Sequence, residues 1–243
     1  MIGLLRAELL KQRSTPTTLL LFLAMFGLVA FAVAIHALAL GADQLSTRSH
    51  QLEVFQVGTR AGMLFAGLMG VIAFTAELRY GTIRPTFLVT PRRGPVIAAK
   101  LAVSGLAGLL FGLLAEGLML VAATVAFAAR GIENQLTGAD YLQLLLGGGA
   151  AAALWAAIGL GVGALVRNQA GAIVGLCVWI LLVESTSDGF VPGAARLMPG
   201  GVGLSLAGNV DKLSVAVATL LLVLYAAAAS AAGWLATLRR DIA

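Results

Sequence analysis

The chain has 243 residues, of which 60% are hydrophobic and only 11% are charged. A soluble domain of this length needs a charged surface, and about 25% charged residues is typical of one, so this composition excludes a soluble globular protein and favours a membrane protein. The formal net charge is +5, but no basic stripe with interleaved aromatic residues accompanies it, so nucleic acid is not an expected partner.

Residues 1–15 are predicted to form an amphipathic helix. Apolar Ile2, Leu5 and Leu9 fall on one stripe at helical spacing, and the cations lie off that stripe at Arg6, Lys11 and Arg13. Such a helix can lie in the membrane interface with its cations near the lipid headgroups. A plain basic leader segment is the alternative.

Long apolar runs follow, and they predict membrane-spanning helices because about 20 apolar residues cross a hydrocarbon core ~30 Å thick. A β-barrel would instead show short segments of alternating polarity. We therefore expect an all-α integral membrane protein, with residues 1–243 forming a single transmembrane domain. Its six spans are placed at about residues 18–40, 57–76, 101–129, 141–166, 170–183 and 213–238.

Two segments between these spans stand out. Residues 41–56 form a polar loop, which leaves Arg60 near the outer end of the second span. Residues 184–212 mix prolines and glycines with apolar patches and are too broken to be a span. They are predicted to form either an outer loop or a re-entrant element, and hydropathy alone does not decide between these two.

Six spans place both termini on one side of the membrane, and the distribution of cations indicates which side. With a cytoplasmic N-terminus, the inner segments hold 11 of the 16 lysines and arginines: Arg6, Lys11, Arg13, Arg79, Arg84, Arg92, Arg93, Lys100, Arg167, Arg239 and Arg240. This asymmetry agrees with the tendency of cytoplasmic loops to be positive. Both termini and residues 77–96 are therefore predicted to be cytoplasmic.

The stretch "ELRYGTIRPTFLVTPRRG", Glu77 to Gly94, carries the largest of these inner clusters of positive charge. Gly81 and Pro91 are residues that interrupt regular structure, so they are expected to set off a short, separately oriented element. Glu77 and Arg84 are placed to close its ends through ion pairs. The simplest interpretation is a positive anchor that faces anionic lipid.

No catalytic motif occurs in the chain. The phosphate-binding string G-x-x-x-x-G-K-[ST] is absent, and no histidine pair or acidic cluster suggests a metal site. We expect no enzyme activity and no cofactor in this chain. Five glycine pairs have G-x-x-x-G spacing, but 30 glycines give roughly four such pairs by chance, so they do not indicate a dimer motif.

Glu116 lies in the middle of an apolar run, where a charge is costly and usually faces a partner or water. It is a candidate for the substrate path. The alternatives are a structural acid bonded to a neighbouring helix and a protonated acid.

The stretch from Gly70 to Lys100 resembles the permease subunits of ABC transporters of the type-2 exporter class. That family shows E-x-R-x-G-T-[IL]-R after its second span, then P-R-R and a lysine that opens the next span. The matching residues here are Glu77, Arg79, Gly81, Thr82, Arg84, Pro91, Arg92, Arg93 and Lys100. The opening "LLRAELLKQRST" and "RLMPGG" at 196–201 are also similar to segments of this family.

This resemblance implies a permease subunit that forms the membrane path of an ATP-driven exporter in a bacterial cytoplasmic (inner) membrane. It implies two copies of a separate ATPase subunit that binds ATP and Mg, a second permease that is identical or homologous, and contact with membrane lipid. It also implies a re-entrant or split element near residues 191–208. The first eight matching residues, Glu77 to Arg93, would form a cytoplasmic coupling helix that docks on the ATPase.

Two other functions remain open. One is a stand-alone secondary transporter with Glu116 as its proton carrier. The other is a membrane anchor or assembly protein that does not transport.

Overall fold

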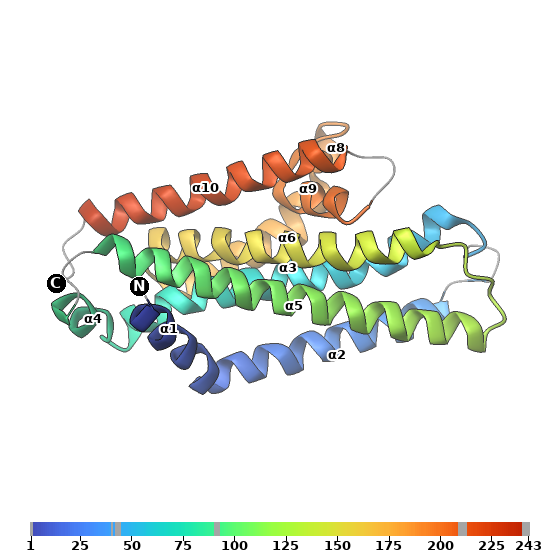
Figure 1. The fold of residues 1–243 in the computed structure, drawn as a ribbon. Coiled ribbons are helices and arrows are strands. Elements are labelled where there is room, and N and C mark those ends of the chain that lie inside the picture. Colours follow the sequence, from blue (N-terminus) through green and yellow to red (C-terminus); the bar gives the residue numbers. More distant parts are fainter. Residues whose placement is uncertain (1, 40, 42–44, 90–92, 209–212, 240–243) are drawn as a thin grey trace.

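The computed structural model describes residues 2–39, 41, 45–89, 93–208 and 213–239. Across these ranges the chain is helical and contains no strand (Figure 1). Six of its helical segments are long and apolar enough to cross a membrane. The predicted all-α class is therefore confirmed, and the number of helices that could span a membrane agrees with the six spans predicted. The elements are α1 (Ile2–Ser14), α2 (Pro16–Ala39), α3 (Arg48–Arg79), α4 (Ile83–Val89), α5 (Arg93–Ala129), α6 (Gly138–Val166), α7 (Gln169–Val178), the π-helical turn η1 (Trp179–Val183), α8 (Glu184–Phe190), the 3-10 turn η2 (Ala195–Leu197), α9 (Pro199–Leu206) and α10 (Val215–Arg239).

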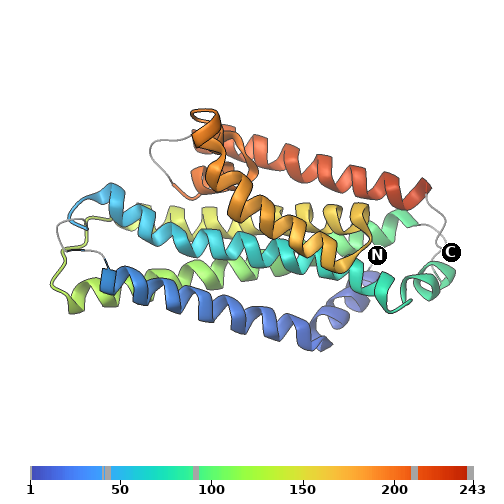
Figure 2. The same cartoon turned by 180° about the vertical axis from the view of Figure 1, so that it is seen from behind.

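The long helices run roughly along one axis (Figures 1 and 2). The short helices α1 and α4 lie at the same end of the bundle as the last turn of α10, and we call this the α4 end. The connections from α2 to α3 and from α5 to α6 lie at the opposite end. An even number of spans therefore returns the chain to the end where it began.

Helices α3 and α6 form the centre of the bundle, whereas α2 and α10 lie on its flanks. The apolar window of α3 is 72% buried and that of α2 only 11%. Leu19, Leu20 and Leu23 of α2 are exposed, as is Leu220 of α10. Exposed leucines on a flank suit contact with lipid, since the hydrocarbon core does not penalise them.

Helix α3 packs against α6 backbone to backbone. A Cβ atom on Gly159 would overlap the carbonyl oxygen of Gly67, and one on Gly70 would overlap the carbonyl oxygen of Ala156. Only glycine fits at such contacts, because small residues let membrane helices approach closely. This contact fixes the separation of the two central helices.

Helix α3 is longer than the apolar span at 57–76, because it begins at Arg48, inside the expected polar loop. The Thr47 hydroxyl caps this extension by accepting from the backbone N–H of His50. Gln51 lies within this extension. Its side-chain amide donates hydrogen bonds to the carbonyl oxygens of Leu45 at 2.9 Å and Glu133 at 2.8 Å. A polar stretch thus continues as helix because its polar groups find partners beyond the apolar run.

The segment at 184–212 contains two short helices rather than a plain loop. Helix α8 continues the fifth span through η1, and α9 lies beneath the first turns of α10 (Figure 1). All 8 residues of α9 are buried. The Glu184 carboxylate joins the two helices by accepting from the backbone N–H of Gly200 at 3.0 Å.

Candidate functional site

Four charged residues meet at the α4 end and form what we call the charge cluster: Glu8, Lys11, Glu77 and Lys100. Lys100 Nζ of α5 donates to Glu77 Oε1 at 2.6 Å and to Glu8 Oε2 at 2.8 Å. Lys11 Nζ donates to Glu77 Oε1 at 2.7 Å and to Glu8 Oε1 at 2.8 Å. Two acids and two cations from three helices thus compensate one another in a largely buried place.

The side chains of the charge cluster differ in exposure. The Lys100 side chain is 2% exposed, whereas that of Lys11 is 41% exposed. Burial lowers the pKa of Lys11, but the hydrogen bonds and charges of Glu77 and Glu8 more than offset it, so its pKa is raised above the ordinary value. Lys11 therefore stays charged beside the two carboxylates.

The charge cluster also sets the orientation of α1. Its polar side faces the bundle, where Gln12 Nε2 also donates to Ser104 Oγ at 3.4 Å. Its apolar Ile2, Leu9 and Leu10 are exposed. Ionic contacts therefore hold the helix on one side, and the exposed side carries these apolar side chains together with Arg6 and Arg13.

Helix α4 follows the charge cluster directly along the chain. Gly81 has φ +69, a left-handed conformation that glycine adopts without strain and that turns the chain after α3. Ile83 is 2% exposed and packs with Phe74 and Leu160. At the other end of α4, Leu88 is 81% exposed. One turn of this short helix is anchored in the bundle and the next presents an apolar side chain outward.

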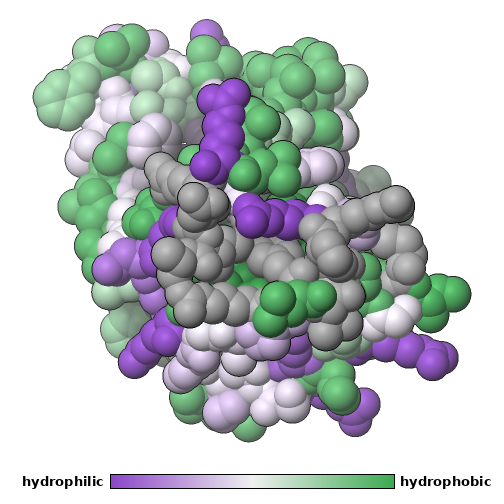
Figure 3. Space-filling view, turned by 90° about the vertical axis from the view of Figure 1, so that its left-hand side faces the viewer, coloured by the Kyte–Doolittle hydropathy of each residue, from purple (hydrophilic) through white to green (hydrophobic). Residues whose placement is uncertain are grey.

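The predicted coupling residues do not all lie together. Arg79 contacts the start of α7, donating to Gln169 Oε1 at 3.4 Å, and its guanidinium lies 5.7 Å from the centroid of the Tyr80 ring. Arg93 reaches α10, where it donates to the carbonyl oxygen of Thr237 at 2.7 Å. Thr82 is exposed in the turn before α4. Figure 3, which views the α4 end, shows hydrophilic side chains projecting among apolar ones.

Three of the predicted residues lie partly or wholly outside the described part. Pro91 and Arg92 are not among the described residues, and only the backbone of Arg84 is described. For Glu77, the ion pairs that the structure describes are with Lys11 and Lys100; the ion pair expected of Arg84 stays a prediction, because its side chain lies outside the described part.

Glu116 lies at the centre of the bundle and is 0% exposed. Its Oε2 accepts from the Thr59 hydroxyl of α3 at 2.7 Å, and its Oε1 has no hydrogen-bond partner in the described part of the chain. A Cβ atom on Gly58 would come within 2.8 Å of Oε2. The acid is thus bonded to a neighbouring helix, as one of the alternatives has it, and its role in a substrate path stays a prediction.

Sequence reasoning missed Glu8 as a member of the charge cluster. A signal was present, because it is the only acidic residue of the basic segment 1–15 and lies three positions before Lys11. Residues at this spacing share a helix face. The pattern indicates a pair within α1, but it contains nothing about Glu77 or Lys100.

A comparison with models of protein families finds a match for this chain. The model of a family described as ABC-2 family transporter protein matches residues 4–185, which include the charge cluster, α4, the first four candidate spans and most of the fifth. A search of curated proteins finds no match. Because the match covers most of the chain, the chain belongs to the ABC-2 family of transporter proteins.

Proposed function

We propose that this ABC-type, multi-pass membrane permease is the transmembrane subunit of an exporter and that a separate ATPase subunit moves it by docking on α4. The permease component of this family lacks an ATPase site of its own. The observation that carries the proposal is the attachment of α4. It is anchored by Ile83, flanked by the charge cluster, and exposes Leu88 at its far end.

The contacts of α4 suit it for transmitting motion. Ile83 packs on α3 and α6. Glu77 lies in the last turn of α3, and Lys100, its ion-pair partner, lies in the first turns of α5. A push on α4 would therefore reach three spans through contacts that are packed or ion-paired. Packed helices respond to such a push by shifting as units, because closely packed interfaces do not deform continuously.

The remaining parts of the proposal rest on membership of the family and on the distribution of cations. The α4 end is cytoplasmic, so both termini are cytoplasmic. Two ATPase subunits, which bind ATP and Mg, close on a pair of permeases that are identical or homologous. The membrane is a bacterial cytoplasmic (inner) membrane. The orientation of α1, with ionic contacts inward and apolar side chains outward, supports an interfacial helix that contacts lipid.

Reversing charge beside α4 tests the proposal. We expect the double variant Arg84→Glu with Arg92→Glu to insert normally into the membrane but to lose most of its co-purifying ATPase, because complementary charge governs encounter and orientation. The measurement is affinity capture of the tagged full-length chain from its native host, with quantification of any ATPase that carries a phosphate-binding loop. Arg13→Glu, at an exposed position of α1, is the matched control. Unchanged capture by the double variant would overturn the docking site.

A proton-driven transporter is the second candidate function, because Glu116 is a buried acid in a candidate span. Glu116→Gln keeps the shape of the side chain and an acceptor for Thr59, but it cannot carry a proton. Our proposal expects the variant to retain ATP-dependent export, measured as cargo uptake into inside-out vesicles. Loss of transport in Glu116→Gln, with transport driven by a pH gradient alone in the wild type, would favour the proton-driven candidate.

A further inference from the structure

Arg60 is an exposed cation on a candidate span, and it lines a cavity. It lies on α3 across a cavity from Leu28 and Ala32 of α2. Leu28 lies roughly 18 Å along α2 from Pro16, given the rise of an α-helix, and α2 is itself a candidate span. Along its own helix Arg60 lies 19 residues before Arg79, roughly 28 Å by the same rise, so it lies toward the far end of a hydrocarbon core ~30 Å thick when that core is measured from the α4 end.

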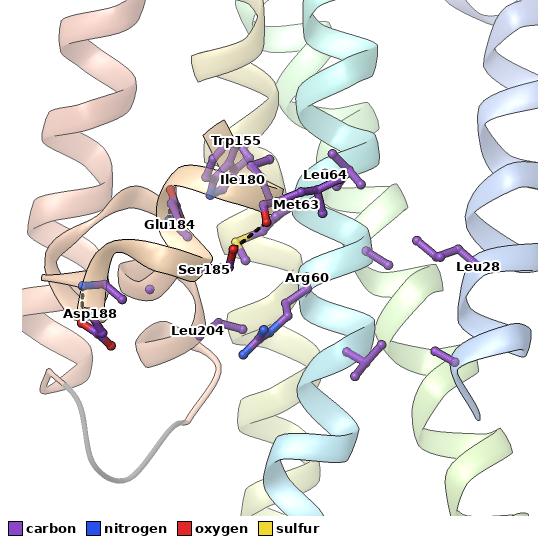
Figure 4. Close-up of a pocket in the computed structure, with 17 residues that line it drawn as sticks. Leu28, Arg60, Met63, Leu64, Trp155, Ile180, Glu184, Ser185, Asp188 and Leu204 are labelled. Carbon is purple, nitrogen blue, oxygen red and sulfur yellow. Dashed lines mark hydrogen bonds between the residues drawn. The ribbon is translucent and has the colours of Figure 1, made fainter. Parts of the chain in front are cut away.

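The cavity beside Arg60 is about 460 Å³ in volume, which falls within the range of small-molecule sites, about 300–1,000 Å³. Its walls come from α2, α3, α6 and the segment from η1 to α9. Figure 4 shows the Arg60 side chain reaching from α3 toward Leu204 of α9, with Ile180 and Glu184 on the facing wall. Most of the lining is apolar, and it includes Met63, Leu64 and Leu181.

In this cavity one carboxylate oxygen of each acid accepts hydrogen bonds, whereas the guanidinium of Arg60 makes none within the described ranges. Glu184 Oε1 accepts from Trp179 Nε1 at 2.7 Å and from the Gly200 N–H. Asp188 Oδ1 accepts from the Ala195 N–H at 2.9 Å. Arg60, in contrast, has no ion pair or hydrogen bond within the described ranges.

A second donor in the cavity lacks an acceptor. Trp155 of α6 is 1% exposed, and its Nε1–H has no hydrogen-bond partner in the described part of the chain. Buried N–H groups are rarely left unpaired, because each lost hydrogen bond costs free energy. One oxygen of each acid therefore helps to hold the α8–α9 turn in place, whereas Arg60 lacks an acceptor; the Trp155 indole nitrogen also lacks one, but it is buried in the wall and has no accessible surface toward the cavity.

We propose that the cavity binds an amphipathic molecule with one anionic head, a phosphate or a carboxylate, and that Arg60 is the counter-ion of that head. The planar guanidinium presents paired donors that match such an oxyanion. The apolar chain would lie between α2 and η1, where Leu28, Ile180 and Leu181 line the wall. That this molecule is exported cargo rests on the proposed function, but its binding does not.

Photolabelling of the full-length chain in phosphatidylcholine nanodiscs tests the site without any ATPase. The probe is a C16 carboxylate that carries a diazirine in its chain, and the matched uncharged probe is the corresponding C16 alcohol. We expect the carboxylate to label α3 and η1 peptides around the cavity about tenfold more than the alcohol does, because a charge-assisted hydrogen bond contributes about that much in affinity.

Variants assign the effect to Arg60. Arg60→Gln is expected to reduce carboxylate labelling of the cavity about tenfold, and Arg60→Lys to give an intermediate level, because lysine keeps the charge but not the paired donors of the guanidinium. Arg130→Gln removes the same charge from an exposed position at the end of α5 and should change nothing. Asp188→Asn, which removes a like charge from the cavity, should leave labelling equal or higher.

The composition of the nanodisc identifies the source of the anionic head. If phosphatidylglycerol in the bilayer abolishes the labelling, the occupant is a membrane lipid. If only dissolved hexadecyl phosphate competes, the occupant comes from solution. Either result supports the site. Equal labelling by carboxylate and alcohol, or undiminished carboxylate labelling in Arg60→Gln, would overturn the proposal, and neither outcome depends on whether α4 docks an ATPase.

Discussion

Replacing Lys100 by methionine is expected to lower the free energy of unfolding by about 3–5 kcal/mol, because the change leaves two carboxylates in a buried place without their central cation. Lys100 donates to both Glu8 and Glu77, and its side chain is 2% exposed. Methionine keeps the length and volume of the side chain, so the loss reports charge rather than a cavity. The measurement is equilibrium unfolding of the purified full-length chain in mixed micelles, followed by tryptophan fluorescence.

Lys11→Met is the matched control for Lys100→Met, because Lys11 donates to the same two carboxylates. The Lys11 side chain is 41% exposed, so water replaces most of the lost interaction with the carboxylates. We expect the free energy of unfolding to decrease by less than about 1 kcal/mol. Adding Glu8→Gln and Glu77→Gln to Lys100→Met should recover much of the stability, since no buried charge then lacks a partner. If the free energy of unfolding decreased equally in the two lysine variants, burial would not determine how much each lysine of the charge cluster contributes to stability.

The charge cluster marks the limit of what the sequence predicts at this end of the bundle. Glu77 and Lys100 stand out as a motif, and Lys11 as a cation of a basic helix. That these three meet Glu8 depends on how α1 lies across α3 and α5, which is a tertiary relation. Periodicity along one helix carries no information about a partner tens of residues away.

The ends of α3 show a different limit. Hydropathy located the apolar part of α3 at 57–76. The helix begins earlier, at Arg48, because polar side chains before the apolar part, such as Gln51, find hydrogen-bond partners there. The sequence therefore placed Arg60 near the outer end of a span. The structure places it well inside the helix beside a cavity. That cavity forms where α2, α6 and the segment from η1 to α9 pack around α3, and hydropathy along a single span does not show such packing.

Glycine spacing could not show where helices touch. The pairs 159/163 and 171/175 are equivalent in the sequence. In the structure, a Cβ atom on Gly163 would come within 2.8 Å of the Val71 carbonyl oxygen, whereas one on Gly175 would have nothing within 4 Å. One pair lies at the contact between α3 and α6 and the other does not, because the face that a helix buries is set by its neighbours.

Gly159→Ala is therefore expected to lower the free energy of unfolding by about 3 kcal/mol or more, at the upper end of what overpacking costs. The added methyl group would overlap the carbonyl oxygen of Gly67, a backbone atom that cannot rotate away. The two central helices would have to separate along their contact. Gly175→Ala adds the same methyl group in open space and should be neutral or stabilise by up to about 1 kcal/mol, since alanine favours helix. Unfolding in mixed micelles, with the monodisperse yield of each variant, measures the difference, and similar stabilities for the two variants would contradict a backbone contact between α3 and α6.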